Sequence, residues 1–222
     1  MPVKAVAFDI DGTLYPNWRM KFHSIPFLFS HIGLVMNFSR VRKEIRKIEN
    51  VENFRELQAA MMSQRTGMDV GAVQNLLERI IYRKWEKIFK RVRPYSGLED
   101  ALTVLRNRGY KLGVLSDFPV GNKLNYFRVD SHWDVTMSSE ETGYLKPHPA
   151  PFLTLAERLG CKPEEVLYVG NSIAYDVKGA SAAGMKTVYI NWKKQDLPDA
   201  DLSIRSYRHF IEKIEFLLTD QG

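Results

Sequence analysis

The chain has 222 residues, of which 45% are hydrophobic, and it carries a net charge of +6. This length and composition predict a globular protein with one good core and room for a small accessory domain. Its single cysteine, Cys161, excludes an internal disulfide and favours a reducing compartment, so we expect a cytoplasmic protein without a signal peptide. The most apolar later stretch, Ile25 to Phe38, is too short and too polar to cross a bilayer, and no membrane partner is expected.

The first notable stretch runs from Val3 to Leu14 and reads VKAVAFDIDGTL. Its short apolar run predicts a strand buried on both faces of a parallel sheet, with Asp9 and Asp11 where that strand ends. Two carboxylates this close repel each other unless a cation or a proton lies between them, so the pair indicates a divalent metal site or two separated pKa values. A calcium loop of the EF-hand type is excluded, because Gly12 and Met20 stand at the wrong positions for it.

After Leu14 the pattern becomes helical for about eighty residues. Asn17 to Phe38 is interrupted by Pro26 and Gly33, which predicts two short helices or one kinked helix. Ser39 is a candidate N-cap for a further basic helix.

Two more helices are predicted before the pattern changes again. Asn50 is a candidate N-cap for the first, and Gly67 is a candidate terminator for it. The clearest helical pattern follows Asp69 and ends near Arg93, with apolar residues at three- and four-residue spacings.

The helical region also differs from the remainder in charge. Residues 15–93 hold 16 Lys and Arg against 7 Asp and Glu. We therefore predict an α-helical cap domain, residues 15–93, inserted into an α/β core formed by residues 1–14 and 94–222.

An alternation of helices and strands follows from Tyr95 onward, which predicts a parallel sheet. The predicted strands of this part are Lys111–Leu115, Asp134–Met137, Val166–Val169, Thr187–Asn191 and Asp201–Ile204.

Polar residues follow several of these strands. Ser116 ends the second strand, Lys146 lies in a loop before a helix, and Asn171 and Asp176 follow the strand that ends at Val169. Ligands bind at the carboxyl ends of the strands in an open α/β sheet, so we expect these residues to meet Asp9 there.

Together these motifs resemble the haloacid dehalogenase-like (HAD) superfamily, in the branch with a helical cap after the first strand, as in phosphoglycolate phosphatase-like enzymes. The resemblance implies a Rossmann-like parallel sheet with the first strand central. It also implies that Asp9 is the nucleophile, that Asp11 is the general acid and base, and that Lys146 offsets negative charge.

The same resemblance implies the rest of the site. Gly12, Thr13, Ser116 and Asp117 fall where the family binds substrate. The implied metal is Mg²⁺, with Asp9, Asp11, Asn171 and Asp176 as its site, Asp11 contributing its backbone carbonyl and Asp176 acting as a ligand or as a partner of the ligands.

Two residues depart from the family pattern. Asn171 stands where Asp is usual, which predicts weaker Mg²⁺ binding because that ion prefers charged oxygens. Asp117 stands where Asn is common. An anion beside a phosphate is unfavourable, so we expect Asp117 to point away, toward a substrate hydroxyl.

The function predicted is a Mg²⁺-dependent phosphatase that hydrolyses a small phosphorylated metabolite through an aspartyl phosphate. A haloacid dehalogenase and a phosphomutase are alternatives with the same nucleophile, although Asp11 argues against the former because dehalogenases replace it. A non-catalytic phosphate- or nucleic-acid-binding protein is the alternative outside enzymes. No nucleic acid partner is expected, because the basic residues of 15–93 belong to amphipathic helices.

Overall fold

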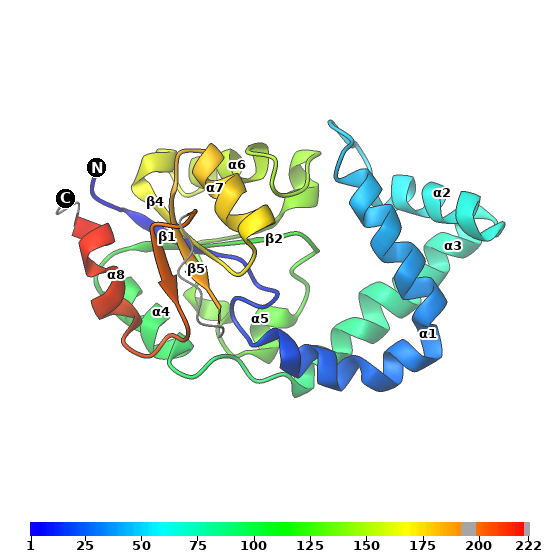
Figure 1. Cartoon of the computed structure of the whole chain (residues 1–222), viewed down its shortest axis with the longest axis horizontal. Helices are drawn as coiled ribbons and strands as arrows, with labels where there is room; N and C mark the ends of the chain where they lie inside the picture. Colours follow the sequence, from blue (N-terminus) through cyan, green and yellow to red (C-terminus); the bar gives the residue numbers. More distant parts are fainter. Residues whose placement is uncertain (192–198, 220–222) are drawn as a thin grey trace.

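A computed structural model of the chain describes residues 1–191 and 199–219. Six parallel strands form one sheet in the order β3-β2-β1-β4-β5-β6, so the first strand is central, as predicted (Figure 1). This order confirms the predicted Rossmann-like α/β class. The strands are β1 (Ala5–Phe8), β2 (Lys111–Ser116), β3 (Val135–Ser138), β4 (Val166–Gly170), β5 (Lys186–Ile190) and β6 (Leu202–Ile204).

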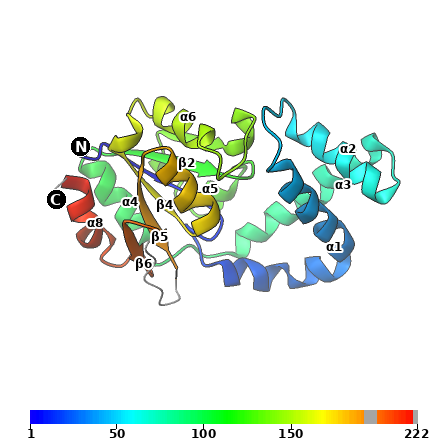
Figure 2. The same ribbon diagram turned by 45° about the horizontal axis from the view of Figure 1, so that its top comes forward.

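Helices cover both faces of the sheet (Figures 1 and 2). Alternate side chains of β1 face opposite layers, as the pleat requires. Val6 and Phe8 join a core with the helices on one face, whereas Ala5 and Ala7 join a second core on the other. The first face carries α4 (Leu98–Asn107), α5 (Lys123–Tyr126) and α8 (Phe210–Thr219), and the second carries α6 (Ala150–Arg158) and α7 (Lys178–Ala182), which continues a π-helical turn at Ile173–Val177.

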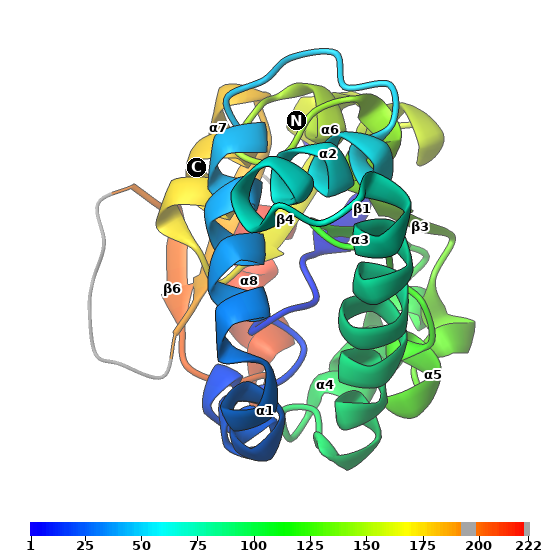
Figure 3. The same ribbon diagram turned by 90° about the vertical axis from the view of Figure 1, so that its right-hand side faces the viewer.

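Residues 17–91, which we call the helical insertion, lie beyond the sheet and its two layers (Figures 1 and 3). Their inward side chains form a third apolar cluster, to which Phe118 and Leu145 of the sheet-bearing part contribute. The helices are α1 (Asn17–Ile45), α2 (Phe54–Thr66) and α3 (Val70–Leu77), continued by a π-helical segment (Glu78–Trp85) and a 3-10 segment (Glu86–Arg91). No helix in the described part of the chain is long and apolar enough to cross a membrane.

Some of the predicted ends of helices in the helical insertion are confirmed by the structure. Gly67 ends α2 with φ of 71°, as predicted, and α3 follows Asp69, also as predicted. Asp69 is in addition the N-cap of α3, because its side chain accepts a hydrogen bond from Ala72 N at 3.0 Å. The backbone of α1 leaves the helical range at His31, where the helix is kinked, so the predicted interruption of this stretch is confirmed.

Two predicted helix starts are wrong. The expected start at Ser39 is wrong because α1 continues through it to Ile45 without a break that a cap could fill. The expected cap at Asn50 is wrong because Asn53 accepts the hydrogen bond from Glu56 N at 3.1 Å.

The chain enters and leaves the helical insertion at neighbouring points. Tyr95 N donates to Leu14 O at 2.9 Å, and Arg19 Nη1 donates to Arg93 O at 3.1 Å. The two crossings are therefore joined by hydrogen bonds and lie side by side.

Candidate active site

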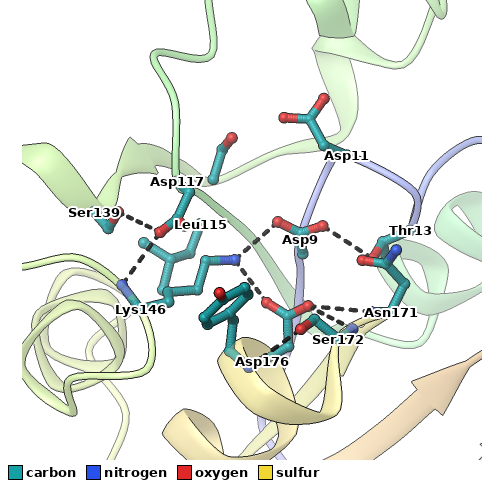
Figure 4. A network of polar contacts seen from close by, with 12 residues as sticks. Asp9, Asp11, Thr13, Leu115, Asp117, Ser139, Lys146, Asn171, Ser172 and Asp176 are labelled. Carbon is teal, nitrogen blue, oxygen red and sulfur yellow. Dashed lines mark hydrogen bonds and ion pairs between the residues drawn. The ribbon is translucent and has the colours of Figure 1, made fainter. Parts of the chain in front are cut away.

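The residues expected to form a site gather at the carboxyl ends of the three central strands (Figure 4). Asp9 follows β1, Ser116 is the last residue of β2, and Asn171 follows β4. Because β1 pairs with both β2 and β4 in parallel register, these three strand ends are adjacent. Lys146 and Asp176 reach the same place from segments farther along the chain.

A buried ammonium joins two buried carboxylates at the centre of the site. Lys146 Nζ donates to Asp9 Oδ1 and to Asp176 Oδ1, both at 2.8 Å (Figure 4). The three residues are 1%, 6% and 2% exposed, so water screens these contacts little. Lys146 Nζ also contacts the Tyr168 hydroxyl at 3.0 Å, and that hydroxyl donates to Leu115 O. All three N–H groups of the ammonium therefore have an acceptor.

Two carboxylates share this one ammonium, so the buried group carries more negative than positive charge when all three are ionised. The pKa values of Lys146 and Asp9 are both raised. Burial alone would lower the pKa of Lys146, but Asp176 and Asp9 outweigh it and raise that pKa well above its usual range. Burial raises the pKa of Asp9 to about 7, and Asp176 and Asp11 add to that rise, whereas Lys146 opposes it. The ammonium therefore stays charged, and the charge of Asp9 changes near neutral pH.

The raised pKa of Asp9 predicts a pH-dependent stability. Between the ordinary Asp value of 3.8 and about 7, the native state binds more protons at Asp9 than the unfolded state does, so its contribution to stability falls as pH rises. With a chelator present, Asp9→Asn should gain about 2 kcal/mol relative to wild type between about pH 5 and about pH 8. Urea unfolding at both pH values measures this. The same difference at both would contradict the assignment.

Oxygen atoms gather on the other side of Asp9. Thr13 Oγ1 donates to Asp9 Oδ2 at 3.1 Å and lies 3.4 Å from Asn171 Oδ1. Gly12 allows this close arrangement: its φ is +97°, and a Cβ there would lie 2.2 Å from Asn171 Nδ2. An uncharged amide oxygen and a carboxylate oxygen thus face one hydroxyl.

Asp11 belongs to a separate group of contacts. Its side chain points away from Asp9 (Figure 4) and accepts hydrogen bonds from Tyr15 Oη at 2.7 Å and Lys123 Nζ at 2.8 Å. Lys123 is buried and lies 5.0 Å from the centre of the Phe89 ring. These partners hold the second carboxylate toward the helical insertion.

Asp117 links the site to the helical insertion. Its Oδ2 pairs with Arg46 Nη1 at 2.6 Å, and its Oδ1 accepts from Ser139 Oγ and from Lys146 N. Arg42 donates to Asp117 O at 2.6 Å. Burial alone would raise the pKa of Asp117, but Lys146, Arg46 and Arg42 outweigh it and hold that pKa below its usual value.

Arg46→Gln should loosen this link. The change leaves a partly buried carboxylate without its charged partner, and we expect a loss of about 2 kcal/mol in the free energy of unfolding together with faster hydrogen exchange in α1. Arg65→Gln, which breaks the exposed pair with Glu44, is the matched control and should cost less than about 1 kcal/mol. Equal losses in the two variants would refute the role of Arg46.

The structure brings together most of the residues that the sequence singled out. One network of hydrogen bonds and ion pairs joins Asp9, Thr13, Lys146, Asn171 and Asp176 (Figure 4). Ser116 is fully buried beside it, and its Oγ accepts from Phe118 N. Asp11 and Asp117 lie at the border of this network. Asp11 pairs with Lys123, and Asp117 pairs with Arg46.

Several contributors were missed from the sequence. They are Tyr15, Arg42, Arg46, Lys123 and Tyr168. Tyr168 carried a signal, because it is a polar-tipped residue in an otherwise apolar strand. Arg42 and Arg46 carried none, because basic residues four apart on a helix are usually solvated.

Comparisons with known proteins agree with this arrangement. A family model described as haloacid dehalogenase-like hydrolase matches residues 6–190. The chain is 33% identical over 208 residues to a glyceraldehyde 3-phosphate phosphatase of Methanopyrus kandleri, a match that covers 88% of this chain and 87% of the relative. It is 28% identical over 197 residues to a phosphoglycolate phosphatase of Xylella fastidiosa, covering 85% and 80%.

Solved structures show the same relationship. The crystal structure of a HAD phosphatase from Thermococcus onnurineus matches 95% of this chain and 97% of its own, with 28% identity and a TM-score of 0.66. Both the sequence match and the fold therefore support the resemblance drawn from the motifs. The chain belongs to the haloacid dehalogenase-like hydrolases.

Proposed function

We propose that this protein is a Mg²⁺-dependent phosphatase that hydrolyses a small phosphorylated metabolite through an aspartyl phosphate. The observation that carries the proposal is the buried Asp9 at the end of the central strand, with the Lys146 ammonium 2.8 Å from one of its oxygens. A carboxylate that attacks a phosphate ester needs positive charge beside it, and Lys146 supplies that charge. The named phosphatases among its relatives support the same reaction class.

The reaction divides between the two carboxylates. Asp9 Oδ forms a bond to phosphorus while the bond from phosphorus to the alcohol oxygen breaks, and the leaving oxygen takes a proton from Asp11. Water then attacks the phosphorus of the aspartyl phosphate and gives a proton to Asp11. The bond to Asp9 breaks, and phosphate is released.

The remaining residues position the phosphoryl group. We assign phosphate contacts to Gly12, Thr13 and Ser116, whose backbone or hydroxyl groups lie at the same strand ends as Asp9. Asp117 is directed at Arg46 and Ser139, so we assign it to positioning rather than to phosphate binding.

The oxygen atoms around Thr13 fit a hard cation. Mg²⁺ is commonly held by one or two carboxylates, waters and the substrate phosphate, and Asp9 Oδ2 and Asn171 Oδ1 both lie within 3.4 Å of the Thr13 hydroxyl. The described residues hold no group of three or more His, Cys, Asp or Glu side chains placed for a metal, so the proposed site depends on the Asn171 amide and the Asp11 backbone carbonyl beside Asp9. Bound Mg²⁺ would polarise the phosphoryl oxygens and offset the charge of the nucleophile.

Asp176 contacts residues of this site through both of its carboxylate oxygens. Its Oδ1 accepts from Lys146, and its Oδ2 accepts from Asn171 N at 3.2 Å and Ser172 N at 3.0 Å. We therefore propose that it orients both the lysine and the loop that carries Asn171, as partners of metal ligands do. Asp9, Asn171 and the Asp11 carbonyl remain the proposed ligands.

We propose that the helical insertion acts as a cap domain, residues 15–93, over the core formed by residues 1–14 and 94–222. Its basic surplus attracts anionic substrates, and Arg42 and Arg46 bring part of that charge to the border of the site. The single cysteine is consistent with action in the cytoplasm.

Phosphate release from p-nitrophenyl phosphate tests the proposed function. We expect release in the presence of Mg²⁺ and little or none with a chelator. Release that is equal in both conditions would contradict the metal requirement. No release in either condition would contradict the phosphatase.

Mg²⁺ activation curves test the assignment of the loop after β4. Asn171→Asp restores a charged oxygen, so it should lower the Mg²⁺ concentration needed for half activity with little change in saturated turnover. Asp176→Asn should raise that concentration about 10- to 100-fold or abolish activity, because it loosens Lys146 and the loop together. An Asp176→Asn enzyme that matches wild type, or an Asn171→Asp enzyme that needs more Mg²⁺, would place the metal elsewhere.

A further inference from the structure

A cavity of about 280 Å³ lies between the helical insertion and the core, with Asp11 in its wall. Lys123 and Asp11 lie together at that point of the lining, and their contact is 2.8 Å. The cavity thus begins at the second carboxylate of the site. The apolar side chains of its wall include Met20, Ile81, Tyr82, Trp85, Phe89 and Phe118.

The cavity wall holds three cations, Arg55, Arg83 and Lys123, and three carboxylates, Asp11, Glu78 and Glu86. Arg55 and Arg83 both contact Glu78, at 2.9 and 3.0 Å. Lys123 contacts Asp11. Among the described residues that line the cavity, every cation therefore has a carboxylate partner. Because the three carboxylates balance the three cations, a second anionic group on a substrate would find no net positive charge there.

The position of the cavity connects it to the leaving group. Phosphorus must lie at Asp9 for attack, and the leaving oxygen must lie within reach of Asp11 to take its proton. The group attached to that oxygen consequently extends past Asp11, which is where the cavity begins. The side chains that line the cavity therefore decide which alcohol the site accepts.

We propose that the substrate's leaving group is uncharged and carries an apolar or aromatic body that occupies this cavity. This inference rests on the proposed phosphatase function and adds a substrate class to it. An aromatic body gains from burial and from contact with the rings of Tyr82, Trp85, Phe89 and Phe118. A carboxylate such as that of phosphoglycolate would lose its hydration in this wall without a compensating cation.

Three esters of primary alcohols test the proposal at saturating Mg²⁺: benzyl phosphate, glycerol 1-phosphate and phosphoglycolate. Each has a primary alkoxide as its leaving group, so differences in kcat/KM report mainly on the group beyond the oxygen. We expect benzyl phosphate to exceed both others by at least about tenfold. Equal or higher kcat/KM for phosphoglycolate or glycerol 1-phosphate would overturn the substrate class while leaving the phosphatase intact. No phosphate from any ester would overturn the proposed function itself.

A charge variant tests the reason for the preference. Glu78→Gln removes the carboxylate that Arg55 and Arg83 share, so the cavity gains uncompensated positive charge. The ratio of kcat/KM for phosphoglycolate to that for benzyl phosphate should rise about fivefold at low salt and less at high salt. Glu44→Gln frees Arg65 elsewhere on the helical insertion and should leave the ratio unchanged. An unchanged ratio in Glu78→Gln, or an equal rise in Glu44→Gln, would refute the electrostatic basis.

Discussion

Asp9→Asn is expected to abolish phosphate release, by more than about 10⁴-fold, while the protein remains folded. The amide has nearly the shape of the carboxylate but lacks the charge and the nucleophilic oxygen that attack phosphorus. Turnover of p-nitrophenyl phosphate at saturating Mg²⁺ measures the effect, and circular dichroism with thermal unfolding reports on the fold. The variant should also form no phosphoenzyme in a rapid-quench experiment with labelled substrate.

Asp130→Asn is the matched control for this change. Asp130 is exposed and lies outside the site network, so the same chemical change there should leave turnover unaltered. Turnover of Asp9→Asn near that of wild type would refute the nucleophile and, with it, the covalent mechanism.

Lys146→Met is expected to damage both stability and activity. Methionine has a similar length but no charge, so Asp9 and Asp176 would face each other in a buried place without their shared cation. Leaving buried charges unpaired costs about 3–5 kcal/mol, which urea unfolding at about pH 8 measures. Activity should fall as well, because no ammonium remains to offset the charge of the phosphoryl group.

A second change separates these two effects. In Lys146→Met with Asp176→Asn, one of the two unpaired carboxylates is gone, so much of the lost stability should return while activity stays low. Lys4→Met, which removes a largely exposed ammonium beside Glu165, should cost less than Lys146→Met. A loss no larger in Lys146→Met than in Lys4→Met would mean that the buried contacts contribute little.

The sheet was predictable because its strands are short apolar runs that end in polar residues. β1, β2 and β4 lie within one or two residues of their predicted bounds. The helical insertion was less predictable. Ser39 looks like a cap in sequence, but α1 passes through it, because tertiary packing of Phe38 and Val41 favours a continuous helix over a local break.

For the site, the sequence indicated residues that follow strands but gave no information on contacts between distant segments. Asp9, Lys146 and Asp176 were predictable because the carboxyl ends of parallel strands converge. The pairing of Asp11 with Lys123 spans 112 positions, and that of Asp117 with Arg46 joins the core to α1. Such pairs depend on how the helical insertion packs, which no local pattern records.

Arg46 follows the last turn of α1 and gives the helical insertion a second attachment to the core. The first attachment lies at the crossings, where Tyr95 N donates to Leu14 O. Between the two, the 29 residues of α1 leave the core, bend at His31 and return to the site (Figure 1). A body fixed at two separate points cannot rotate about one of them without releasing the other. Any swing of the helical insertion about the crossings therefore has to break the contact between Arg46 and Asp117.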